Sequence, residues 1–218
     1  MRLPHRPEVP RHVVVFDCNV YLDVASVLAA PFDWAAFDAA VARLAKAPVP
    51  HPTDPALDSL RAVAGCTSGR FAGKETLEVW TSAHIDATVR SKAKHPSIPD
   101  PRTGYRGLGW SQSDAQGLVD ELIHGATERS DGGTLGNCIP DGNPPLDHED
   151  GLVYGACRKL AGDDPLATVY CVTRDRDFLG ARTAGSLSGH TKVITPSTFV
   201  GLIRAARASF SIERMRRS

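Results

Sequence analysis

The stretch HVVVFDCNVYLDV, residues 12–24, begins as a continuous apolar run and then places Asp17 and Asn19 at the end of that run. Continuous apolar runs are typical of strands that are buried on both faces, as in a parallel sheet. Aspartate is a poor strand residue, and burying its charge without a partner is costly. The stretch therefore predicts a central strand that ends at a carboxylate, with other groups nearby to hold the charge.

Three further segments have the character of strands, and helical patterns alternate with them. The expected strands are 12–16, 76–82, 167–173 and 192–195. The expected helices are 20–30, 32–46, 82–93, 113–125, 148–161 and 196–209. This alternation predicts an α/β fold, a three-layer α/β/α sandwich around a mostly parallel central sheet of four to five strands.

Three segments rich in proline and glycine interrupt this pattern, at 46–58, 95–110 and 130–146. Because such residues break helices and favour turns, we expect these segments to be insertions. They decorate a single domain over residues 10–205 rather than linking two domains. Residues 206–218 form a basic C-terminal tail, whose end FSIERMRRS (210–218) is expected to be disordered.

Size and composition narrow the class of protein. A chain of 218 residues is long enough for one domain with a real core. The formal net charge is zero, because there are 25 Lys and Arg residues and 25 Asp and Glu residues. This balance argues against a protein that coats nucleic acid by its net charge, but it leaves room for a local basic patch. There is no apolar run of the ~20 residues that span a bilayer, so no membrane association is expected. Five cysteines without a CxxC pair are typical of reduced thiols in a cytoplasmic protein.

Acidic residues from separate regions fall where the carboxyl edge of the sheet is expected. They are Asp17 after the first strand, Asp147, Glu149 and Asp150 at the start of the helix 148–161, and Asp175 and Asp177 after the strand 167–173. Ligands of open parallel sheets bind at this edge. Carboxylates brought together repel each other unless a cation lies between them, and Mg²⁺ or Mn²⁺ prefers oxygen ligands. The sequence therefore predicts a site for Mg²⁺ or Mn²⁺, with Asn19 and Thr173 beside it.

Each acid also has an ordinary structural explanation. Asp17 or Asn19 can cap the helix that follows. The acids that begin the helix 148–161 suit its dipole, and the run RDRD (174–177) can be a solvated charged turn. We favour the metal site because three distant segments converge on one edge of the sheet.

Four blocks, FDCN (16–19), HED (148–150), VTRDRDF (172–178) and ITPSTFVGLI (194–203), resemble the PIN-domain nucleases in this order. The resemblance implies a metal-dependent ribonuclease that hydrolyses phosphodiester bonds of single-stranded or structured RNA. Such enzymes are commonly the toxin of a bacterial toxin–antitoxin pair, as in VapC-like proteins. An antitoxin protein and a second copy in a homodimer are the protein partners that the resemblance implies.

The resemblance also assigns roles to the acids. The expected catalytic residues and metal ligands are Asp17, Asp150, Asp175 and Asp177, with Asn19, Thr173, Asp147 and Glu149 holding or orienting them. The family carries a glutamate on the helix after the second strand, where this chain has Ala87 or Thr88. Asp86 is the nearest acid and is the expected substitute as a metal ligand. A shift of two residues turns a helical side chain by about 200°, so the register of Asp86 decides whether it faces the metal.

Basic and aromatic residues after the second strand suit contacts with RNA. The expected substrate-binding residues are Lys92, Lys94, Arg102, Tyr105 and Arg106. Basic groups bind phosphates, and aromatic rings stack on unpaired bases. An ordinary exposed loop explains the same residues equally well.

Two other functions compete with the ribonuclease. Because the expected glutamate is missing, the chain can be a degenerate PIN scaffold that binds RNA or a protein without cleavage. A phosphohydrolase of the haloacid dehalogenase type would use Asp17 as its nucleophile. This last function is disfavoured, since FDCN lacks a second aspartate two residues after the first.

Overall fold

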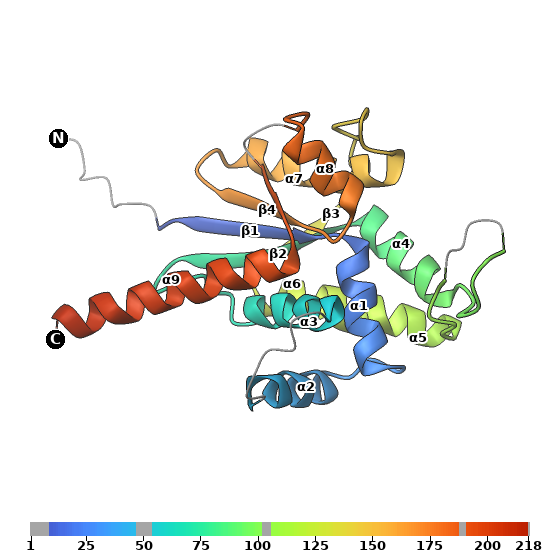
Figure 1. Cartoon of the computed structure of the whole chain (residues 1–218), viewed down its shortest axis with the longest axis horizontal. Coiled ribbons are helices and arrows are strands. Elements are labelled where there is room, and N and C mark those ends of the chain that lie inside the picture. Colours follow the sequence, from blue (N-terminus) through green and yellow to red (C-terminus); the bar gives the residue numbers. More distant parts are fainter. Residues whose placement is uncertain (1–8, 47–53, 102–105, 188–190, 218) are drawn as a thin grey trace.

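The computed structural model describes residues 9–46, 54–101, 106–187 and 191–217, and within them five parallel strands form one sheet (Figure 1). In chain order the strands are β1 (Arg11–Phe16), β2 (Thr76–Ser82), β3 (Gly133–Leu135), β4 (Thr168–Val172) and β5 (Thr191–Ile194). Their order across the sheet is β3-β2-β1-β4-β5. The parallel sheet expected from the apolar runs is thus confirmed.

β1 lies at the centre of the sheet, as its apolar sequence predicts. Val14 pairs with Val79 of β2 on one side and with Tyr170 of β4 on the other. β2 and then β3 lie on one side of β1, and β4 and then β5 lie on the other side. The strand order therefore reverses between β1 and β4, and the crevice at such a reversal is where open α/β sheets bind ligands.

Helices cover both faces of the sheet. They are α1 (Cys18–Leu28), α2 (Trp34–Lys46), α3 (Pro55–Cys66), α4 (Ala83–Lys94), α5 (Gln112–Gly117), the π-helical η1 (Leu118–His124), α6 (Gly125–Arg129), α7 (His148–Asp163), α8 (Arg176–Thr183) and α9 (Pro196–Arg217). Figure 1 shows α7 and α8 on one face and α1, α3 and α9 on the other, with α2 outside α1 and α3. This is the three-layer α/β/α sandwich that the sequence predicts.

Two of the expected insertions contain regular structure. The segment 46–58 overlaps the start of α3, where Asp54 caps the helix by accepting a hydrogen bond from the N–H of Ala56. Pro55 occupies the first turn, where its missing N–H costs nothing. The segment 130–146 contains β3, which is too short to give an apolar run.

The expectation of disorder in the tail segment FSIERMRRS (210–218) is wrong for residues 210–217, because they continue α9. Arg207 helps to hold this helix on the body by donating to the backbone oxygens of Gly65, Arg70 and Phe71. Figure 1 shows the C-terminal half of α9 extending beyond the sheet. No helix in the described part of the chain is long and apolar enough to cross a membrane.

The position of α7 is fixed by a close contact with the segment before it. The N–H of Asp141 donates to the carbonyl oxygen of Gly151 at 2.9 Å. One turn later, a Cβ on Gly155 would lie 2.0 Å from the carbonyl oxygen of Ile139, so only glycine fits there. This contact seats α7 so that its first turn lies at the carboxyl edge of the sheet.

Candidate active site

Asp17 leaves β1 in the middle of the carboxyl edge and is only 3% exposed. It occupies the N-cap position of α1, and the structure describes the whole of this helix. The side chain of Asp17 nevertheless makes no capping hydrogen bond to α1. Instead, Oδ2 accepts hydrogen bonds from the hydroxyl of Thr173 at 2.8 Å and from Nδ2 of Asn19 at 3.1 Å. Capping therefore does not explain a buried carboxylate at this position.

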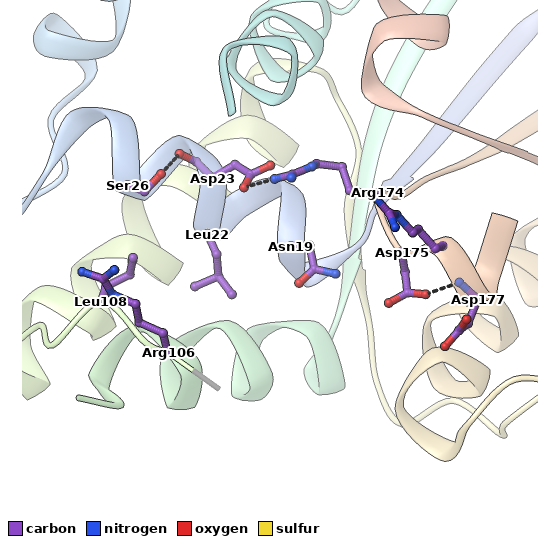
Figure 2. A pocket seen from close by; sticks show the side chains of 10 residues that line it. Asn19, Leu22, Asp23, Ser26, Arg106, Leu108, Arg174, Asp175 and Asp177 are labelled. Carbon is purple, nitrogen blue, oxygen red and sulfur yellow. Dashed lines mark hydrogen bonds and ion pairs between the residues drawn. The ribbon is translucent and has the colours of Figure 1, made fainter. Parts of the chain in front are cut away.

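Thr173 connects the carboxylate that follows β1 to the one that follows β4. Its hydroxyl is buried, donates to Asp17 and accepts from the N–H of Asp175 at 2.9 Å. Asp175 caps α8, since its Oδ1 accepts from the N–H groups of Asp177 and Phe178. Figure 2 shows the side chains of Asn19 and Asp175 pointing toward the same space. The acids of two neighbouring strands are thus joined through one hydroxyl.

Asp150 adds a third carboxylate, from the first turn of α7. Asp147 caps this helix by accepting a hydrogen bond from the N–H of Asp150 at 2.8 Å. Burial, and then the negative charges of Asp17, Asp175 and Asp147, raise the pKa of Asp150 from 3.8 to about 7. The pKa of Asp17 is also raised, chiefly by burial. We refer to Asp17, Asp150 and Asp175 as the acid cluster.

Lys92 places a positive charge beside the acid cluster. Its Nζ lies 3.3 Å from a carboxylate oxygen of Glu149, and its charge lowers the pKa of both Asp17 and Asp150. His84, Thr88 and Lys92 follow one another at intervals of four residues and so share one face of α4. Thr88 is one of the two positions at which the resemblance to PIN-domain nucleases would place a glutamate. Where the family carries an acid, this chain has a neutral hydroxyl and then a cation one turn further on.

Asp86 is engaged elsewhere. Its Oδ1 accepts a hydrogen bond from the hydroxyl of Thr81 at 2.9 Å, and its Oδ2 lies 2.8 Å from Nε2 of His124. The π-helical segment η1 ends at His124 and carries this partner. Both carboxylate oxygens are therefore occupied by contacts outside the acid cluster.

The other expected residues lie around the cluster. Asp177 is exposed on the first turn of α8, and its backbone N–H is held by Asp175. Lys94 is exposed in the last turn of α4. Arg106 is exposed and lines a pocket beside the cluster. Arg102 and Tyr105 lie outside the described residues.

The chemistry of the donors fits a hard divalent ion. The donors are carboxylate oxygens, and burial together with the neighbouring negative charges raises the pKa of Asp150 by more than Lys92 lowers it. As they stand, however, no three or more His, Cys, Asp or Glu side chains within the described residues form a group that could hold a metal ion. A metal ion would have to draw these carboxylates closer together.

No family model matches the chain. No curated protein and no solved structure matches it either. The likeness to PIN-domain nucleases thus remains a resemblance of four short blocks, and the function has to be argued from the site itself.

The pKa of Asp150 predicts how stability depends on pH. A carboxyl group whose pKa is higher in the folded than in the unfolded state binds more protons when folded, so the free energy of unfolding falls as pH rises. The fall should span the range from about pH 4 to about pH 7. Since Asp150 is only half buried, we expect its size to be on the order of 1 kcal/mol after allowance for solvent screening.

Urea denaturation across this pH range would measure the effect. The variant Asp150→Asn cannot titrate, so it should lose this part of the pH dependence and be more stable than the wild type above pH 7. Identical pH profiles for the two proteins would show that Asp150 has an ordinary pKa.

Proposed function

We propose that the protein is a metal-dependent ribonuclease that hydrolyses phosphodiester bonds of RNA at the acid cluster. The observation that carries this proposal is the convergence of Asp17, Asp150 and Asp175, from three separate segments, at the reversal of strand order. Burial, and then the negative charges of Asp17, Asp175 and Asp147, raise the pKa of Asp150 to about 7 even with Lys92 nearby, so ionising this carboxylate is costly and a divalent cation would stabilise it. Perturbed carboxyl groups in a crevice of this kind are typical of functional sites.

The chain's own residues orient the carboxylates. Thr173 fixes Asp17 and the backbone of Asp175 through a single hydroxyl. Asn19 donates a second hydrogen bond to Asp17, so this carboxylate has a fixed orientation. In the reaction, the ammonium group of Lys92 is placed to neutralise part of the negative charge of an approaching phosphate.

Asp17, Asp150 and Asp175 would hold Mg²⁺ or Mn²⁺. A bound divalent ion supplies Lewis-acid polarisation of the phosphate and a bound water of lowered pKa. Asp177 is near enough in the chain to serve as an outer ligand. Asp86 has no part in this proposal, because Thr81 and His124 already occupy its oxygens.

Metal removal is the first test of the proposal. Titration calorimetry should show binding of Mn²⁺, and incubation with single-stranded RNA should give fragments only when Mn²⁺ or Mg²⁺ is present. EDTA should abolish cleavage, and excess Mn²⁺ should restore it. Cleavage that persists in EDTA, or a protein that binds no divalent ion, would contradict the proposal.

Lys92 should compete with the metal ion for the acid cluster. Replacing it by Gln removes a positive charge next to Asp17 and Asp150, so we expect Mn²⁺ to bind roughly tenfold more tightly. The titration should be made well above the pKa of Asp150, where the carboxylates are ionised. Lys94→Gln is the matched control, because Lys94 is exposed in the same turn of α4. Weaker binding by Lys92→Gln would mean that Lys92 holds the ligands in place instead.

A second candidate function is a scaffold that binds RNA without cutting it. The hydrogen bonds of Asp86 with Thr81 and His124 favour it. They leave the cluster without the acid that PIN-domain nucleases carry on the helix after the second strand. The same experiments separate the two functions. Binding of RNA by the wild type without metal-dependent cleavage would support the scaffold.

A further inference from the structure

A pocket of about 610 Å³ lies beside the acid cluster (Figure 2). Its lining comes from three parts of the chain: residues 19–26 of α1, residues 106–108 before α5, and residues 174–177 at the start of α8. Asn19 and Asp175 belong to both the pocket and the site, so a molecule in the pocket lies next to the acids. The volume is within the ~300–1,000 Å³ that is usual for small-ligand pockets.

Three arginines line this pocket, and one of them is fixed in place. Arg174 forms an ion pair with Asp23, whose other oxygen accepts a hydrogen bond from the hydroxyl of Ser59 at 2.6 Å. Ser59 is fully buried, so the linked side-chain contacts from Ser59 through Asp23 to Arg174 anchor this wall of the pocket. The ion pair also neutralises Asp23, which removes one negative charge from the lining.

The other two arginines are available for an anion. Within the part of the chain that the structure describes, neither Arg106 nor Arg176 forms an ion pair with an acid. Both are exposed, and they enter the pocket from different segments, the irregular segment before α5 in one case and the first turn of α8 in the other. Arginine is suited to phosphate because its planar fork can donate two hydrogen bonds to the same group.

Apolar groups complete the lining. Leu22 of α1 and Leu108 contribute carbon surface to the lining. A nucleobase has apolar faces that can lie against such side chains, while its sugar-phosphate backbone needs cations. The lining therefore has both of the surfaces that a nucleotide requires.

We propose that this pocket receives one unpaired nucleotide of RNA next to the phosphate that lies at the acid cluster. This inference rests on the proposed ribonuclease function and specifies its substrate as single-stranded RNA. A base within a duplex is stacked and paired, so it cannot enter a pocket without being unstacked at a cost of a few kcal/mol. Arg106 and Arg176 bind the backbone phosphates on either side of that nucleotide.

The test is binding of a fluorescein-labelled oligouridylate, followed by fluorescence anisotropy in EDTA at several salt concentrations. Arg106→Gln and Arg176→Gln should each weaken binding roughly 3- to 10-fold at low salt and make the salt dependence shallower by about 0.7 in log–log slope. Arg182→Gln, an exposed arginine at the other end of α8 that does not line the pocket, is the matched control and should bind as the wild type does. An RNA hairpin whose nucleotides are almost all paired should bind more weakly than the oligouridylate.

The outcomes separate this inference from the proposed function. If Arg106→Gln and Arg176→Gln keep the affinity and salt slope of the wild type, or if the wild type does not bind the oligouridylate, the pocket proposal is overturned even when the protein cleaves RNA elsewhere. Equal affinity for the hairpin overturns the requirement for an unpaired nucleotide. If both variants lose affinity but the wild type does not cleave RNA with metal, the pocket proposal stands and the ribonuclease proposal fails.

Discussion

Asp17→Asn should lower metal-dependent cleavage of single-stranded RNA by about 100- to 1,000-fold, while the protein stays folded. The substitution removes one negative charge from the acid cluster and leaves an amide oxygen that can still accept from Thr173. Because burial already raises the pKa of Asp17, the neutral side chain should be tolerated at this position. Cleavage of a labelled oligonucleotide under saturating Mn²⁺ measures the first effect, and thermal denaturation measures the second.

Asp163→Asn is the control for this experiment. Asp163 is an exposed acid at the far end of α7 from the acid cluster, so its replacement should leave cleavage unchanged. An Asp17→Asn variant that is folded and fully active would place the catalytic centre away from β1. Such a result would remove the main support for the ribonuclease proposal.

Gly155→Ala should destabilise the protein by about 3 kcal/mol, a large effect for the addition of one methyl group. A Cβ at this position would lie 2.0 Å from the backbone oxygen of Ile139, which cannot rotate away as a side-chain tip could. Either α7 or the segment that crosses it must therefore move. Urea denaturation would measure the loss of stability.

Gly162→Ala, in the same helix, separates this clash from the general effect of alanine. Gly162 is exposed, and a Cβ there would meet nothing within 4 Å. Alanine is a better helix former than glycine, so this variant should be more stable by up to about 1 kcal/mol. Equal destabilisation by both substitutions would mean that α7 is sensitive to alanine for another reason.

The elements with long apolar runs could be predicted from the sequence. β1 and β4 are read directly from HVVVF and ATVYCV, and their pairing explains why Asp17 and Thr173 meet. β3 was not expected because three residues, GTL, are too few to show a period. α8 was not expected because the charges of RDRD hide the helix that Asp175 caps.

The composition of the acid cluster was partly predictable. The rule that ligands bind at the carboxyl ends of strands identified Asp17 and Asp175, and the helix start HED identified Asp150. The positions of Lys92 and Asp86 depend instead on which neighbours each helix face meets. His124, the partner of Asp86, lies 38 residues further along the chain on a π-helical segment, and no periodic pattern marks that contact.

The hydrogen bond between Thr173 and Asp17 joins residues 156 positions apart. During translation, the first of these leaves the ribosome long before the second is made, and pairing between such distant strands is slow even in a complete chain. The acid cluster therefore cannot assemble before the chain has been synthesised past Asp175. The proposed nuclease would therefore be unable to cut the messenger and ribosome that produce it until the segment with Asp175 has emerged.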